Sequence, residues 1–342
     1  MKPLFVYPAL MAGLLLALAP YSIEAQQTQS VKFVLDWKFQ GDHAPWGLAI
    51  DRGYFQREGL TVIMDQGSGS GDAINKVASG AYDIGFADLN LLVKFDADYP
   101  QARVIAFLVL FERSLNSITT LKSHNISQPK DLEGKTVAGA LGDSSRMMFP
   151  IFARVTGIDT NKVVWQSISP QLRASLLLNN QLDAISGFTS GTVFDLIGAG
   201  ANRDDITYLR YSDYGLDLYG NALITSAAYA QKHPDALRSF VRATISGLRD
   251  ASADPVTGVA SLKNRDSLVD APLEVDRFRL MLDQTMLTKE VREKGLGTVD
   301  PARLAKGLAY VAEAFGVHNP PETDEIYSDA YLPPPQDRAV NR

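Results

Sequence analysis

The chain of 342 residues contains no cysteine, and this absence removes several kinds of chemistry at once. Without thiols the protein has no disulfide, no thiolate nucleophile and no zinc–thiolate site. It also has no cysteine to carry a lipid that would tether a secreted protein to a membrane. The composition therefore favours a free periplasmic protein, if the chain is exported.

Histidine is scarce as well, with four residues at positions 43, 124, 233 and 318. None of them has the His-Glu-x-x-His spacing of a zinc hydrolase, and the Gly-x-Ser-x-Gly elbow of a serine hydrolase is missing. The sequence therefore favours a binding protein over an enzyme, and it predicts no metal and no cofactor.

Runs of basic residues are also missing. Lysine and arginine number 33 against 39 acidic residues, which gives a net charge of −6. Because no basic stretch is present to neutralise phosphates, we predict no binding to nucleic acid. The 46% apolar content is ordinary for a globular protein, and the length favours two lobes over one core. The acidic net charge favours a soluble monomer, and so does export from the cytoplasm, which the N-terminal segment predicts.

The longest apolar run, residues 10–19, is too short for a bilayer span, which needs about 20 residues. Lys2 precedes it, and Ala25 follows as a small residue ahead of the polar Gln26. This order predicts a signal peptide over residues 1–25, cleaved near Ala25, and a periplasmic mature protein. An uncleaved anchor is the alternative, because a single lysine is a weak charged region.

Short apolar runs alternate with amphipathic stretches along the mature chain. Residues 31–35 and 60–64 are typical of strands, and residues 46–58 of a helix between them. Two later segments, 78–86 and 179–188, share one order: a helix end, a polar turn, an aspartate and a short strand. The pattern predicts two similar α/β units, although such junctions also recur by chance.

Several segments, taken together with their spacing, are specific to one family. They are Leu35-Asp36-Trp37, His43, Gly53-Tyr54-Phe55, residues 58–62 (EGLTV), 80–88 (GAYDIGFAD), 132–137 (LEGKTV), 181–184 (QLDA) and Tyr331-Leu332-Pro333. Over nearly the whole mature chain they resemble the NMT1/THI5-like solute-binding proteins, relatives of the thiamine-pyrimidine and sulfonate binders.

The resemblance implies a type II periplasmic-binding-protein fold, in which two doubly wound α/β lobes are joined by two crossover strands. We expect lobe 1 to comprise residues 26–117 and 221–332, and lobe 2 residues 118–220, with crossovers near 117–121 and 220–225. Residues 333–342 are expected to form a mobile tail. The resemblance further implies a small-molecule solute held between the lobes, and an ABC transporter permease and ATPase as partners.

Ligands of open α/β sheets bind beyond the carboxyl ends of the strands, where loops and helix N-termini offer polar groups. This rule selects four loops, residues 36–43, 66–71, 86–90 and 142–146. Residues 188–189 occupy the matching strand end of lobe 2, and Tyr214 is a further aromatic candidate near the return crossover. The candidate ligand-binding residues are Asp36, Trp37, His43, Ser68, Gly69, Asp88, Ser144, Ser145, Arg146, Phe188, Thr189 and Tyr214.

Each candidate also has an ordinary structural role to weigh against binding. Trp37, Phe188 and Tyr214 offer flat surfaces for stacking, yet aromatic residues also pack beneath loops. Asp88 can accept hydrogen bonds from an amine, or cap a helix. Arg146 can grip an anion, or lie on the surface.

The charges in these loops favour a particular ligand. They contain Asp36, Asp42, Asp88 and Asp143, whereas Arg146 and Lys38 are the only cations. An anion would be desolvated among carboxylates, so we rank an aminopyrimidine-like N-heteroaromatic first, another aromatic second and an alkyl sulfonate third.

Two features keep alternatives open. Residues 38–42 replace the Pro-Asn that thiamine-precursor binders show after the Asp-Trp pair, which weakens the ligand ranking. A sulfonate binder, a sensory module of the same fold and a pyrimidine-synthesising enzyme remain as alternatives. The enzyme is disfavoured because the enzymes of this family use a cysteine-rich loop.

Overall fold

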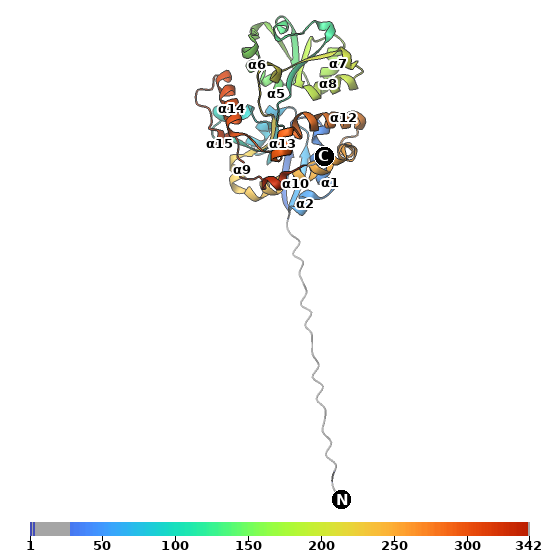
Figure 1. The fold of residues 1–342 in the computed structure, drawn as a ribbon, viewed down its shortest axis with the longest axis vertical. Coiled ribbons are helices and arrows are strands. Elements are labelled where there is room, and N and C mark those ends of the chain that lie inside the picture. Colours follow the sequence, from blue (N-terminus) through green and yellow to red (C-terminus); the bar gives the residue numbers. More distant parts are fainter. Residues whose placement is uncertain (2, 4–27, 341–342) are drawn as a thin grey trace.

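The computed structural model describes residues 1, 3 and 28–340, which form two α/β lobes (Figure 1). The predicted signal peptide and its cleavage near Ala25 lie outside the described residues. Within the described part of the chain, none of the helices combines the length and the apolarity that crossing a bilayer requires.

Lobe 1 is built on a five-stranded sheet with the order β2-β1-β3-β10-β4. The strands are β1 (Gln29–Val34), β2 (Leu60–Asp65), β3 (Ile84–Asp88), β4 (Val104–Val109) and β10 (Asn221–Ser226). β10 runs antiparallel to both β3 and β4, whereas β1 pairs in parallel with β2 and β3. The helices between these strands are α1 (Ala44–Asp51), α2 (Tyr54–Arg57), α3 (Ser70–Ala78) and α4 (Leu91–Asp98).

Lobe 2 repeats this topology with the strand order β7-β6-β8-β5-β9. The strands are β5 (Asn116–Leu121), β6 (Thr136–Gly139), β7 (Val164–Ser167), β8 (Ala184–Phe188) and β9 (Ile206–Arg210). Its helices are α5 (Ser144–Met147), α6 (Phe149–Thr156), α7 (Arg173–Leu178) and α8 (Thr189–Gly198). Here β5 is the inner antiparallel strand, the counterpart of β10. The two α/β units expected from the sequence are therefore present.

The remaining helices belong to lobe 1 and follow β10. They are α9 (Ala227–Lys232), α10 (Pro234–Ala253), α11 (Pro255–Lys263), α12 (Ala271–Met281), a π-helical turn (Leu282–Met286), α13 (Lys289–Lys294), α14 (Pro301–Phe315) and α15 (Thr323–Ile326). Aspartates begin several of them, because a carboxylate at the N-cap satisfies free backbone N–H groups. Asp254, Asp270 and Asp300 cap α11, α12 and α14 in this way, and each cap precedes a proline in the first turn.

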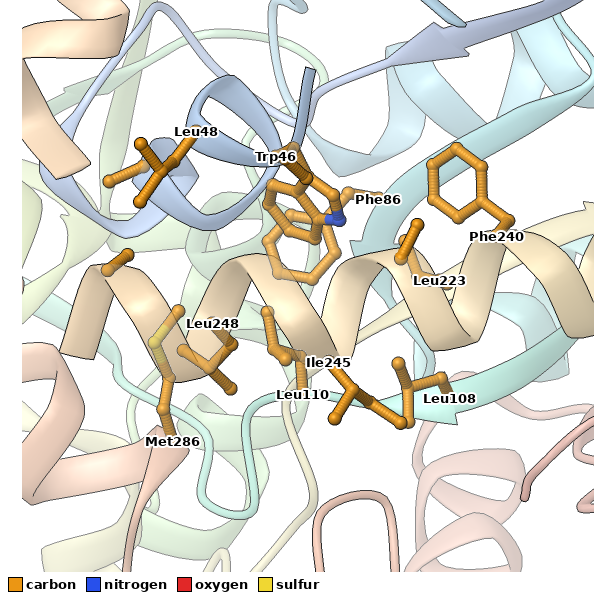
Figure 2. Packing of buried hydrophobic residues seen from close by; sticks show 14 of the residues in the cluster. Trp46, Leu48, Phe86, Leu108, Leu110, Leu223, Phe240, Ile245, Leu248 and Met286 are labelled. Atoms are coloured by element: carbon orange, nitrogen blue, oxygen red, sulfur yellow. The ribbon is translucent and has the colours of Figure 1, made fainter. Parts of the chain in front are cut away.

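The core of lobe 1 forms where α1 packs on α10 (Figure 2). Trp46 of α1 is fully buried, and its indole N–H donates to Thr244 Oγ1 at 3.1 Å. Its ring meets the edge of Phe86 at a centroid distance of 4.8 Å. Because Phe86 lies on β3, this contact fixes α1, and the loop before it, against the sheet.

The chain crosses between the lobes at residues 110–115 and 211–220, which hydrogen-bond to each other. Ser114 N–H donates to the Leu218 carbonyl at 2.9 Å, and Gly220 N–H to the Phe111 carbonyl at 2.8 Å. The segments expected as crossovers, 117–121 and 220–225, largely coincide with the inner strands β5 and β10, which begin directly after the crossings. The predicted boundary at 117/118 falls inside β5, whereas 220/221 falls at the start of β10.

The tail was expected to be mobile from residue 333 onward, but the structure packs it as far as Val340. Arg249 of α10 donates to the carbonyls of Ala339 and Asp337 at 2.8 and 2.6 Å. Arg338 donates to the Leu296 carbonyl at 2.8 Å. These contacts hold the tail to lobe 1.

Candidate functional site

A small cavity of about 30 Å³ lies between the lobes, at the carboxyl ends of strands from both sheets. This is the position at which α/β sheets bind ligands. Lobe 1 contributes the loop after β1 and the turn before α3. Lobe 2 contributes the starts of α5, α7 and α8. The lining residues are Asp36, Trp37, Gln40, Asp42, Gly69, Ser70, Asp143, Ser144, Ser145, Arg173, Phe188, Ser190 and Gly191.

Buried hydrogen bonds fix the loop after β1. Asp36 accepts from Asn221 Nδ2 at 2.7 Å, and its other oxygen lies 3.0 Å from His43 Nε2. The backbone N–H of Gln40 donates to His43 Nδ1 at 3.2 Å, so Nε2 is the nitrogen that donates to Asp36. The loop is thereby tied to β10 and to itself, and it holds Trp37 and Asp42 at the cavity.

Two hydrogen-bond donors of this loop are buried at the cavity. Trp37 Nε1 and Gln40 Nε2 make no hydrogen bond to any group in the described part of the chain. Buried donors are paired in the great majority of proteins, so these two N–H groups are available to acceptors of a ligand or of water in the cavity. The sequence pattern indicated Trp37 for its ring, but not for its indole N–H.

Two carboxylates face the cavity from opposite lobes. Asp42 is buried, and one of its oxygens lies 3.6 Å from His43 Nε2. Asp143 accepts from the Arg146 backbone N–H at 2.9 Å, which caps α5. Burial raises the pKa of both carboxyl groups. Both acids therefore favour a ligand that brings hydrogen-bond donors.

Arg173 lines the cavity, but its charge is already paired. Its Nε and Nη2 donate to the same Asp195 oxygen at 3.2 and 2.9 Å. The guanidinium lies 5.0 Å from the centroid of the Trp37 ring. Since Trp37 belongs to lobe 1 and Arg173 to lobe 2, this cation–π contact also joins the lobes.

Asp195 is the centre of a buried ionic group, which we call the Asp195 cluster: Asp195, Arg173, Arg277, Lys38 and Glu274. From lobe 1, Arg277 Nη2 and Lys38 Nζ reach Asp195 at 3.1 and 3.3 Å. Burial alone would raise the pKa of Asp195, but the three cations outweigh it and hold that pKa at about 2. The carboxylate is therefore ionised at every physiological pH, and it links the lobes.

The opposite edge of the cavity is closed by backbone contacts. Gly71 N–H donates to the Gly142 carbonyl at 3.0 Å across the two lobes. Deeper in the cleft, Ser144 Oγ donates to Asp88. The lobes are thus in contact on both sides of the cavity, as in a closed binding protein.

The structure divides the predicted site residues into two groups. Those that line the cavity are Asp36, Trp37, Gly69, Ser144, Ser145 and Phe188. Those outside the lining are His43, Ser68, Asp88, Arg146, Thr189 and Tyr214.

The second group has other contacts. His43 is fully buried behind Asp36, and Asp88 accepts from Asn90 and Asn116 as well as Ser144. Ser68 N–H donates to Asp72, and Thr189 Oγ1 donates to the Leu115 carbonyl. Arg146 donates to Gly139 and Ser167 and packs on Trp165, and Tyr214 packs on Phe152.

The predicted site lacked several lining residues, of which Arg173 has the largest consequence. The sequence predicted Arg146 and Lys38 as the cations of the site, whereas neither lines the cavity. Residues 168–173 follow β7, so the strand-end rule would have selected them had that strand been recognised. The described residues contain no group of histidine and acidic side chains suited to a metal ion.

The fold and the interlobe cavity place the protein in the class of periplasmic-binding-protein folds. Residues 40–257 match the family model described as NMT1/THI5 like, and the chain belongs to that family.

Both an enzyme and a binding protein are among the relatives that are similar in sequence to this chain. A 4-amino-5-hydroxymethyl-2-methylpyrimidine phosphate synthase of Schizosaccharomyces pombe is 26% identical over 238 residues, which is 67% of each chain. A formylaminopyrimidine-binding protein of Halalkalibacterium halodurans is 25% identical over 247 residues, covering 72% of this chain and 73% of the relative.

Solved structures confirm the fold. The alkanesulfonate-binding protein SsuA of Xanthomonas axonopodis pv. citri, bound to MOPS, superposes with a TM-score of 0.65 at 14% identity, covering 88% and 99% of the two chains. The nitrate-binding protein NrtA of Synechocystis superposes with a TM-score of 0.64 at 11% identity, covering 89% and 87%. At such identities the likeness concerns the fold alone.

Proposed function

We propose that the protein is the solute-binding component of an ABC importer, and that it captures a small planar N-heteroaromatic solute between its lobes. Its partners would be a permease and an ATPase, and it would act as a monomer in the periplasm. The observation that carries the proposal is the interlobe cavity itself, with unpaired donors and buried carboxylates facing a tryptophan.

The polar groups of the cavity suit an aminopyrimidine-like ring. Ring nitrogens are acceptors, which Trp37 Nε1 and Gln40 Nε2 can satisfy. Exocyclic amino groups are donors, which Asp42 and Asp143 can accept. The aromatic faces of Trp37 and Phe188 supply apolar contact for the plane of the ring. The formylaminopyrimidine-binding relative supports this choice.

The enzymatic alternative is favoured by the synthases among the relatives. Two observations oppose it. The chain has no cysteine, and both ring nitrogens of the buried His43 are engaged by Asp36 and Gln40. A histidine held in this way supports the loop and does not line the cavity, so the geometry favours capture over turnover.

Calorimetry of the mature protein, beginning at Gln26, tests the proposal against an aminopyrimidine, an aromatic carboxylate and an alkyl sulfonate. We expect the aminopyrimidine to bind, with a rise in melting temperature and a smaller radius of gyration by X-ray scattering. Trp37→Ala should weaken this binding about 10- to 100-fold, since stacking on an aromatic contributes ~1–3 kcal/mol per base. Trp165→Ala, a tryptophan outside the cavity, is the matched control.

Two results would contradict the proposal. One is the failure of every solute in a broad library to change the melting temperature and the scattering profile. The other is the release of a chemically altered product during prolonged incubation, observed by mass spectrometry, which would establish an enzyme.

A further inference from the structure

We propose that Asp195 determines specificity by excluding anions, because it neutralises the one cation that lines the cavity. The inference deepens the proposed solute-binding function and rests on it. It concerns a residue that does not line the cavity and that acts through Arg173. Asp195 is therefore a positioning residue.

Arg173 has little capacity left for a ligand. Among the described residues that line the cavity, it alone carries a cationic side chain. It is 3% exposed, and its Nε and Nη2 are both directed at Asp195. Its Nη1 lies 3.4 Å from the Ser186 carbonyl. A sulfonate or carboxylate needs these same N–H groups, so it would have to compete with a bound carboxylate.

The backbone around Arg173 is shaped to hold it in this position. A Cβ atom on Gly187 would lie 2.5 Å from Arg173 Nη1, and one on Gly191 would lie 3.1 Å from Nη2. Gly187 also has a φ of +152°, which side chains rarely adopt. The guanidinium is thus packed against bare backbone at the start of α8, and it has little space to turn away from Asp195.

The balance of charge around the cavity also disfavours the binding of an anion. The Asp195 cluster holds three cations (Arg173, Arg277, Lys38) and two acids (Asp195, Glu274), a sum of +3 − 2 = +1. The cavity adjoining it is lined by three further acids, Asp36, Asp42 and Asp143. Removing the charge of Asp195 raises the sum of the cluster to +2 and leaves the charge of Arg173 without a counterion beside the cavity.

The test is to measure the binding of methanesulfonate to Asp195→Asn by calorimetry and by thermal shift. We expect wild type to bind methanesulfonate weakly, and Asp195→Asn to bind it at least about tenfold more tightly, since a hydrogen bond to a charged group favours the complex by that order. The gain should disappear in Asp195→Asn/Arg173→Met. Asp195→Glu keeps the charge and should show no gain.

Two further variants keep the result interpretable. Asp250→Asn removes an acid from the partly exposed Arg52, far from the cavity, and should leave methanesulfonate binding unchanged. If Asp195→Asn folds poorly, Asp195→Asn/Lys38→Gln removes one of the surplus cations, while Arg277 keeps its bonds to the carbonyls of lobe 2. The same gain in affinity is expected there.

Tight binding of methanesulfonate by wild type would overturn the proposal. So would its failure to bind more tightly to either folded Asp195→Asn variant, or a gain that survives Arg173→Met. The probe is an anion and not the natural solute, so these outcomes are independent of whether an aminopyrimidine binds. A failure of the proposed function would appear separately, in the solute screen of wild type.

Discussion

Replacing Arg277 with methionine tests whether the Asp195 cluster holds the lobes closed. Arg277 extends from α12 of lobe 1 into lobe 2, where it is 1% exposed. It donates to the carbonyls of Ser190 and Gly191, each at 3.0 Å, and to Asp195 at 3.1 Å. Methionine has a comparable length and removes all three bonds, so the variant isolates the hydrogen bonds from the packing.

The expected size of the effect follows from these contacts. At a net ~1 kcal/mol for each hydrogen bond, closure should lose roughly 2–3 kcal/mol, because Asp195 keeps Arg173 and Lys38. If the closed form is the form that binds, affinity for the solute should fall about 30- to 150-fold. In the variant, Glu274 still accepts the hydrogen bond from the Gly41 N–H at 2.6 Å, but it loses its ion pair with Arg277. A buried carboxylate without a cation is destabilising, so the melting temperature should also fall.

The assay combines calorimetry of the bound solute with X-ray scattering of the free and bound protein. Arg279→Met is the matched control, because Arg279 lies on the same helix and pairs with Asp276 of that helix. We expect the control to leave affinity and scattering unchanged. An Arg277→Met protein with wild-type affinity and a wild-type change in radius of gyration would refute the reasoning.

Two further predictions concern closure and pH. In Gly69→Ala the new Cβ would lie 2.2 Å from the Gly142 carbonyl of the other lobe, so we expect a larger radius of gyration and weaker solute binding. Gly80→Ala is the control, because a Cβ there meets strain in the backbone but no neighbouring atom. It should leave the radius of gyration and the binding as in wild type. Burial raises the pKa of Asp96 from 3.8 to about 7. Because the pKa of Asp96 is higher in the folded protein than in the unfolded chain, the free energy of unfolding falls as the pH rises from 3.8 through 7. Asp96→Asn should therefore stabilise the protein by roughly 2–4 kcal/mol at pH 8, and this gain should vanish near pH 4; equal melting-temperature differences at both pH values would contradict the assignment.

The loops of lobe 1 could be predicted because their strands are strongly patterned. The apolar run before Asp36 and the glycines before α3 indicated where strands end, and both loops line the cavity. The strand before Arg173 gave no such signal. β7 is an edge strand whose residues are mostly exposed, so it lacks the apolar run that indicates burial. The cation of the site was missed for that reason.

Sequence patterns also could not tell which candidates face the cavity and which lie behind it. His43 follows β1 and Asp88 ends β3, strands whose carboxyl ends lie at the cavity, but hydrogen bonds that depend on residues distant in the sequence keep both side chains out of its lining. Asp36, which bonds His43, is oriented by Asn221, which lies 185 residues further along the chain. Asn116 from the other sheet holds Asp88. The same holds for the tail, whose partner Arg249 lies on α10.

The acids of the cavity connect ligand binding to closure. Asp42 and Asp143 are buried in this arrangement of the lobes, and burial raises the pKa of each, which means that the charged forms are disfavoured there. The cation beside them cannot compensate, since Asp195 already occupies it. A solute that donates hydrogen bonds to these carboxylates removes this cost, whereas an anion adds to it. On the proposed function, the same arrangement would explain both a preference for donors and closure on capture: the ion pairs of the Asp195 cluster link the lobes, and a donor solute would offset the cost of the buried acids.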